Sequence, residues 1–130
     1  MADLHNDDVV VDLGSGDGSI IIKIAEDGFV CHGYEINLFL VIYTWIRIYK
    51  RGLQRQAFVH WGNMWKVDCS KFTVVIIYGF PTIMKDLEKK LQTELQVNAR
   101  VISNSFQFPV WKNSQALDEI FLYKKSSVLK

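Results

Sequence analysis

The chain has 130 residues, of which 49% are hydrophobic and 22% charged. This is the size and composition of one globular domain, so we expect a single domain over residues 1–130, with the polar residues 1–8 as a tail. A formal net charge of +1 provides no strong field toward nucleic acid, and no nucleic-acid partner is predicted.

Neither the start of the chain nor its apolar runs indicate a targeting signal or a membrane span. Residues 1–8 lack the basic-then-apolar order of a secretory signal and the Arg-rich character of a mitochondrial presequence. The longest nearly apolar run, residues 38–49, is shorter than the roughly 20 residues that a membrane span needs. On these features alone we expect a cytoplasmic protein.

The first half of the chain alternates between strand and helix patterns. Residues 9–13, which begin with three β-branched valines, predict a buried parallel strand, and residues 17–27 predict a helix that stops at Gly28. Residues 29–35 again predict a strand. Asn37 is typical of a helix cap, which indicates a second helix that runs to about Arg51 and ends at Gly52.

The second half continues this alternation. Residues 57–61 and 72–78 predict strands joined by an abbreviated crossover, and Pro81 begins a helix with Leu87, Leu91 and Leu95 as its apolar stripe. Residues 100–106 predict a fifth strand and residues 116–123 a sixth that returns antiparallel. The sequence therefore predicts an α/β fold, a Rossmann-like, mostly parallel sheet of about six strands with helices on both faces.

The turn after the first strand is rich in glycine, with Gly14, Gly16 and Gly18 in a G-x-G-x-G pattern. Such a turn lets backbone N–H groups approach a charged or polar ligand at the carboxyl end of the sheet. The dinucleotide fingerprint G-x-G-x-x-G does not fit, because position 19 is Ser19. The observed spacing after an acidic residue instead resembles the first motif of class I methyltransferases, which bind S-adenosylmethionine.

Further polar residues follow the next two strands. Glu35 can accept both ribose hydroxyls of a nucleoside, and the Asn63 amide can bond the adenine edge between Ile36 and Met64. Asp12 would anchor the ammonium group of the methionine part of S-adenosylmethionine through water. The predicted cofactor-binding residues are Asp12, Gly14, Ser15, Gly16, Asp17, Gly18, Glu35, Ile36, Asn63 and Met64.

Together with residues 10–18, the motifs in residues 33–37, 65–67 and 87–91 resemble the mitochondrial lysine methyltransferases that modify membrane carriers of energy metabolism. Residues 74–81 and 99–102 look more like the branch that acts on the c subunit of ATP synthase than the branch that acts on the adenine nucleotide translocase. The resemblance implies an S-adenosylmethionine-dependent lysine methyltransferase with a small membrane protein as its substrate and a mitochondrial setting. Tyr78, Gly79, Phe80 and Pro81 are the predicted acceptor pocket.

Three positions depart from the family pattern: Ser19 stands in place of arginine, Leu38 in place of proline and Asn63 in place of aspartate. A non-catalytic cofactor-binding or assembly module and a small-molecule methyltransferase therefore stay as alternatives. The three histidines are scattered, so no metal site is predicted. Core packing is the commoner role for an apolar helix such as residues 38–51, although part of its surface could contact lipid or a hydrophobic substrate.

Overall fold

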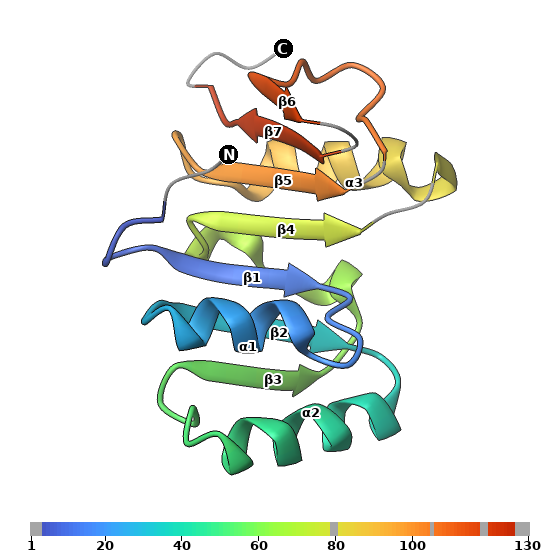
Figure 1. Ribbon diagram of the computed structural model, residues 1–130. Coiled ribbons are helices and arrows are strands. Elements are labelled where there is room, and N and C mark those ends of the chain that lie inside the picture. Colours follow the sequence, from blue (N-terminus) through green and yellow to red (C-terminus); the bar gives the residue numbers. More distant parts are fainter. Residues whose placement is uncertain (1–3, 79–80, 105, 118–119, 127–130) are drawn as a thin grey trace. The chain divides into compact units, whose positions relative to one another are not determined.

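The computed structural model describes residues 4–78, 81–104, 106–117 and 120–126. The chain divides into two compact parts, one formed by Leu4–Val67 and the other mainly by Asp68–Lys130. Each part contains its own hydrogen-bonded strands and at least one helix (Figure 1).

The first part is a parallel βαβαβ unit. In chain order its elements are β1 (Val9–Leu13), α1 (Ser19–Glu26), β2 (Val30–Glu35), α2 (Leu38–Lys50), β3 (Ala57–Trp61) and the short 3-10 helix η1 (Met64–Lys66). β2 lies between β1 and β3, with Leu13 paired to Tyr34 and Glu35 paired to Trp61. The carboxyl ends of the three strands therefore lie at one edge.

Local sequence explains where the two helices of this part begin and end. Gly18 has a left-handed backbone (φ +81°), so α1 begins at Ser19 and not at the predicted residue 17. The Asn37 side chain accepts hydrogen bonds from the backbone N–H groups of Phe39 and Leu40, which confirms it as the cap of α2. Gly28 and Gly52 follow the two helices, as predicted, and both have positive φ.

The second part is a mixed sheet with one long helix. Its elements are the 3-10 helix η2 (Cys69–Lys71), β4 (Val74–Tyr78), α3 (Pro81–Glu94), β5 (Arg100–Asn104), β6 (Gln115–Leu117) and β7 (Ile120–Lys124). β4 and β5 are parallel, whereas β7 runs antiparallel to both β5 and β6. α3 begins at Pro81 as predicted and buries Leu87 and Leu91 of the predicted apolar stripe together with Met84. Leu95 is also buried, but it follows the end of the helix at Glu94.

Four predicted strands differ from the structure. β2 begins at Val30 and not at residue 29. The Phe72 N–H donates to the Cys69 carbonyl in a turn, so β4 begins at Val74 and not at residue 72. The Ser103 hydroxyl donates to the carbonyl of Phe106, and β5 ends at Asn104. The single final strand predicted over residues 116–123 is wrong: this stretch contributes to two paired strands, β6 and β7, of which β7 returns antiparallel as expected.

Candidate functional site

The site begins at the glycine loop, residues 14–18, which follows β1. The N–H groups of Gly14 and Ser15 donate to the Tyr34 carbonyl at 2.8 and 3.0 Å, so the loop is fastened to the end of β2. Gly14, Gly16 and Gly18 have φ values of +85°, +60° and +81°. Residues with a Cβ rarely adopt this conformation, which explains the three glycines.

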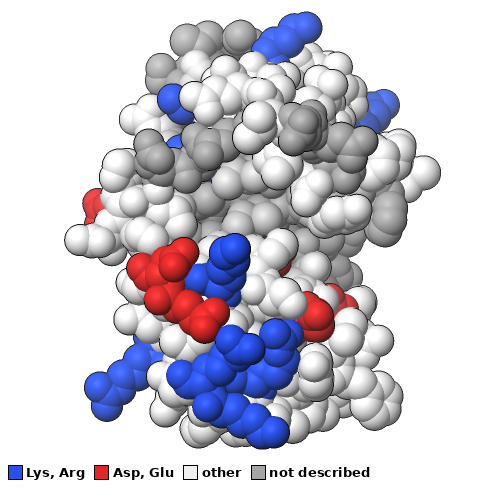
Figure 2. Space-filling model, in the orientation of Figure 1, with Lys and Arg blue, Asp and Glu red and all other residues white. Residues whose placement is uncertain are grey.

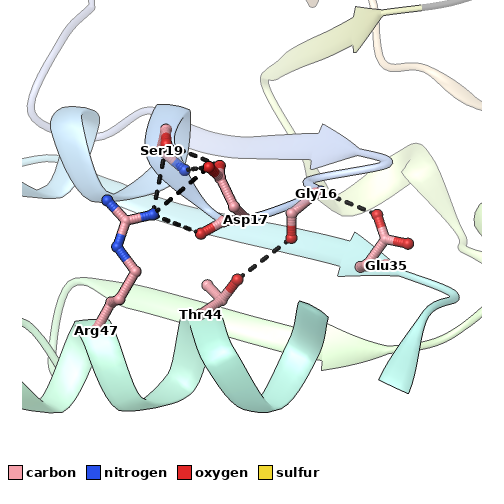
Figure 3. A network of polar contacts seen from close by, with 6 residues as sticks. All are labelled: Gly16, Asp17, Ser19, Glu35, Thr44 and Arg47. Carbon is pink, nitrogen blue, oxygen red and sulfur yellow. Dashed lines mark hydrogen bonds and ion pairs between the residues drawn. The ribbon is translucent and has the colours of Figure 1, made fainter. Parts of the chain in front are cut away.

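Glu35 points toward this loop from the end of β2 (Figure 3). Its Oε1 accepts the Gly16 N–H at 2.9 Å, and its Oε2 accepts the Asn37 N–H at 2.9 Å. An ionised carboxylate offers about four lone-pair sites, so acceptor capacity remains on both oxygens. Glu35 thus fixes the loop and still presents a carboxylate at the strand ends.

A pocket of about 290 Å³ adjoins Glu35 within the first part. Five predicted cofactor-binding residues line it: Gly14, Glu35, Ile36, Asn63 and Met64. Tyr34, Gly62 and Trp65 also line the pocket and were not predicted. These three residues lie within two positions of Glu35 or Asn63 in the sequence, and this proximity could have identified them as pocket residues. The pocket is close to the lower end of the volume range, about 300 to 1,000 Å³, of small-molecule sites.

Hydrogen bonds between side chains and the backbone hold the pocket residues Ile36 and Asn63. The Trp61 indole N–H donates to the Ile36 carbonyl at 2.9 Å, and the Ile36 side chain is exposed. The Asn63 side-chain oxygen accepts the Trp65 N–H at 2.9 Å and caps η1. Asn63 therefore positions the 3-10 turn that carries Met64, besides lining the pocket itself.

Asp12 lies on β1 just before the glycine loop and is 3% exposed. Burial, and to a smaller extent the charge of Glu35, raises the pKa of Asp12 from 3.8 to about 7. Asp12 does not line the pocket. A nearby cation would favour the ionised form of this carboxyl and lower its pKa.

The remaining loop residues interact mainly with the protein. The Asp17 carboxylate accepts hydrogen bonds from the Ser19 N–H and hydroxyl at 3.0 and 2.7 Å, which hold the pKa of Asp17 below its usual value. The Ser15 hydroxyl is buried without a hydrogen-bond partner in the described structure. A Cβ on Gly18 would lie 2.2 Å from Cγ2 of Thr44.

Two residues of α2 that were not predicted reach the glycine loop (Figure 3). The Thr44 hydroxyl donates to the Gly16 carbonyl at 3.3 Å, and the Arg47 guanidinium donates to the Asp17 carbonyl at 2.8 Å. These contacts span 28 and 30 residues. No local sequence signal indicates which face of α2 meets the loop.

The departures from the family pattern are accommodated locally. Ser19 bonds Asp17, and Nη1 of Arg47 lies 3.4 Å from its hydroxyl. Leu38 is the first residue of α2, which the Asn37 cap already starts. Asn63 caps η1 through its side-chain oxygen, an interaction that an aspartate also makes.

The predicted acceptor pocket is described only in part. Tyr78 ends β4, pairs with Asn104 of β5 and is 58% exposed. Pro81 begins α3 and is exposed. Gly79 and Phe80 lie outside the described residues, so the pocket stays a prediction. Within the described ranges, no group of His, Cys, Asp or Glu is arranged to hold a metal ion.

Comparison with known proteins connects this geometry to a family. A family model described as the ANTKMT methyltransferase domain matches residues 12–115. The chain is 48% identical over 103 residues to the Xenopus laevis lysine N-methyltransferase of the ATP synthase c subunit, covering 79% of this chain and 46% of that protein. This chain thus spans about half the length of that relative.

Two further proteins match over a larger share of their own length. A protein-lysine N-methyltransferase of Saccharolobus islandicus is 35% identical over 119 residues, covering 90% of this chain and 74% of that protein. The crystal structure of an RNA methyltransferase from Salinibacter ruber in complex with S-adenosyl-L-homocysteine has a TM-score of 0.92 at 27% identity. It covers 96% of this chain and 85% of that chain.

The structural match confirms the predicted Rossmann-like methyltransferase fold. The sequence matches confirm the predicted family resemblance. The chain belongs to the ANTKMT methyltransferase domain family.

Proposed function

We propose that this chain binds S-adenosylmethionine and forms the methyltransferase part of a protein-lysine N-methyltransferase. The observation that carries the proposal is the glycine loop beside the pocket: apart from its two chain neighbours, a Cβ on Gly14 or Gly16 would have no protein atom within 4 Å. Glu35 bonds the same loop and lines the same pocket. The residues present therefore fit a nucleoside cofactor with a charged amino-acid group.

The described residues suggest how the cofactor would be held. Glu35 would accept the ribose hydroxyls, while Ile36 and Met64 would flank the adenine and Asn63 would bond its edge. The space beside Gly14 and Gly16 would admit the amino-acid part of S-adenosylmethionine. An ionised Asp12 carboxylate would stabilise the ammonium group of that part. When bound, the sulfonium supplies an activated methyl group for in-line displacement.

The protein's contribution to the transfer would be mainly positional. A neutral amine must lie in line with the methyl group, and such positioning alone provides a large share of the rate enhancement. A lysine, with an ordinary pKa of about 10.4, must first lose a proton, which a desolvated acceptor pocket favours. We assign that pocket to the segment from Tyr78 to Pro81.

The acceptor is proposed from the relatives. The frog relative is named as a lysine N-methyltransferase of the ATP synthase c subunit, and the archaeal relative as a protein-lysine N-methyltransferase. Both names support a lysine of a protein as acceptor, and the first supports a small membrane protein. The mitochondrial setting rests on the same resemblance.

Cofactor binding is tested first, by calorimetric titration of S-adenosyl-L-homocysteine into the wild-type chain, Glu35→Ala and the control Asp27→Ala. Asp27 is an exposed carboxylate in the same part of the chain. We expect Glu35→Ala to weaken binding by about 10- to 100-fold, the range of lost charged hydrogen bonds, and Asp27→Ala to leave it unchanged. Absence of wild-type binding would refute the cofactor assignment.

The acceptor is tested by transfer of a labelled methyl group from S-adenosylmethionine to the ATP synthase c subunit in detergent, with mass spectrometry of its lysines. RNA and small amines serve as competing acceptors, because the Salinibacter ruber structure is described as an RNA methyltransferase. We expect label on lysine only. Label on RNA or on the small amines would refute the lysine assignment, and binding without any transfer would support a non-catalytic module.

A further inference from the structure

Helix α2 exposes most of its apolar side chains. Only Thr44 and Ile48 of its 13 residues are buried. Its exposed large apolar residues are Leu38, Phe39, Ile42, Tyr43, Trp45, Ile46 and Tyr49, with Phe39 81% exposed. Contiguous apolar patches of this kind mark interaction sites more often than isolated exposed residues do.

The spacing places these residues on one side of the helix. Phe39, Ile42, Ile46 and Tyr49 follow each other at three- and four-residue steps, so they form one line along α2. The aromatic residues Tyr43 and Trp45 flank this line. We call these six residues the outer face of α2.

The opposite side of α2 is committed to the glycine loop. Thr44 and Arg47 donate hydrogen bonds to the carbonyls of Gly16 and Asp17. The helix cannot rotate to bury its outer face without breaking both contacts. Exposure of the outer face is therefore a consequence of how α2 supports the loop.

All charged side chains of α2 are positive. α2 contains no Asp or Glu, and its last turn carries Arg47 and Lys50. Arg47 and Arg51 form ion pairs with Asp17 and Glu26, whereas Lys50 and Arg55 are exposed. In Figure 2, Lys and Arg side chains gather over the region where Figure 1 places α2.

We propose that the outer face of α2 docks on an anionic lipid surface, with the helix lying in the plane of the bilayer interface. Trp and Tyr favour this interface because their rings are apolar with one polar atom, and basic side chains add attraction to anionic headgroups. The helix is about 20 Å long. Among the described residues, no helix is long and apolar enough to cross a bilayer.

The width of the apolar face favours lipid over a single partner helix. A helix pair buries a narrow seam of two positions per heptad. The outer face of α2 is wider, because Tyr43 and Trp45 on its two flanks are each 53% exposed. Docking on lipid does not require methyl transfer, so this proposal and the proposed activity fail separately.

The test is flotation of the whole chain with vesicles of phosphatidylcholine alone or with about 30% phosphatidylserine. We expect binding to the anionic vesicles that weakens at high salt. The double variant Phe39→Ser/Ile46→Ser should bind at least about tenfold less well, because it removes apolar area. The double variant Lys50→Glu/Arg55→Glu should lose the preference for phosphatidylserine.

Matched variants in the second part of the chain serve as controls. Val110 and Leu117 are exposed apolar residues, and Lys85 and Lys112 are exposed cations. Val110→Ser/Leu117→Ser and Lys85→Glu/Lys112→Glu should leave flotation unchanged. Urea denaturation shows whether each α2 variant keeps the fold of the first part, without relying on cofactor binding.

Three results would overturn the proposal. The wild-type chain could fail to float with either vesicle, or the control variants could lose as much binding as the α2 variants. Light scattering could instead show a dimer that Phe39→Ser/Ile46→Ser converts to a monomer, in which case a second copy covers the outer face.

Discussion

The glycine loop has an open side and a packed side. A Cβ on Gly14 or Gly16 would meet nothing within 4 Å, whereas a Cβ on Gly18 would lie 2.2 Å from Thr44 Cγ2. All three glycines have positive φ. In this motif the first two glycines have open space beside them, which we propose that the ligand occupies, whereas the third lets α2 approach the loop.

The largest effect is expected on the packed side. Gly18→Ala should lower the free energy of unfolding by about 3 kcal/mol or more, because overpacking costs about 1–3 kcal/mol and left-handed backbone costs about 1–2 kcal/mol. Urea denaturation measures the loss. Gly28→Ala is the control, since Gly28 has φ +94° with no atom within 4 Å of a Cβ.

A second variant isolates the steric contribution. Thr44→Ser removes the Cγ2 atom that a Cβ on residue 18 would meet and keeps the hydroxyl. Gly18→Ala should therefore cost less in a Thr44→Ser background than in the wild type. If Gly18→Ala lowers the free energy of unfolding no more than Gly28→Ala does in the wild type, Gly18 is not packed against Thr44.

Asp12 should produce the next largest effect, seen as a dependence of stability on pH. Its folded pKa of about 7 exceeds the ordinary value of 3.8, so the folded state holds this proton more tightly than the unfolded state. The stabilisation is complete below about pH 4 and is lost as pH rises through about 7. We expect a loss of about 1 kcal/mol per pH unit between about pH 5 and 7.

Asp12→Asn should flatten this dependence in denaturation experiments across the same range. Asp27→Asn, on an exposed carboxylate of the same part, should leave the slope as in the wild type. A slope that persists in Asp12→Asn would assign the titration to another group.

Gly16→Ala examines the open side and should separate stability from binding. Its Cβ meets no protein atom, so unfolding should change only by about the 1–2 kcal/mol of a left-handed alanine. Affinity for S-adenosyl-L-homocysteine should fall by about tenfold or more, because the Cβ occupies space that the ligand needs. Unchanged affinity, measured by calorimetry, would place the ligand elsewhere.

Ser15→Ala should have the smallest effect. The Ser15 hydroxyl is buried without a partner in the described structure, and a Cβ on Gly33 would lie 2.8 Å from its oxygen. Loss of an unpaired buried hydroxyl should leave stability unchanged or raise it by up to about 1 kcal/mol. A clear drop in the urea midpoint would show that the hydroxyl has a partner.

Local sequence was sufficient to predict the helices and most of the strands, and it identified many of the residues that line the pocket. β1 and β3 agree with their predicted bounds, because apolar runs and glycines act over a few residues. Glu35, Asn63 and Met64 were predicted to bind the cofactor and line one pocket. They come together because parallel strands end at the same edge, a rule of topology that the strand order implies.

Only the tertiary structure decided which glycines of the loop have open space beside them and which face of α2 is buried. It also decided the burial that raises the pKa of Asp12 to about 7. Thr44 and Arg47 reach the glycine loop across 28 and 30 residues of chain, and packing at that distance has no local pattern. The apolar sequence of α2 suggested a core helix, yet only Thr44 and Ile48 are buried. Burial depends on what surrounds a side chain in space, whereas sequence records only its chemical type and its neighbours along the chain.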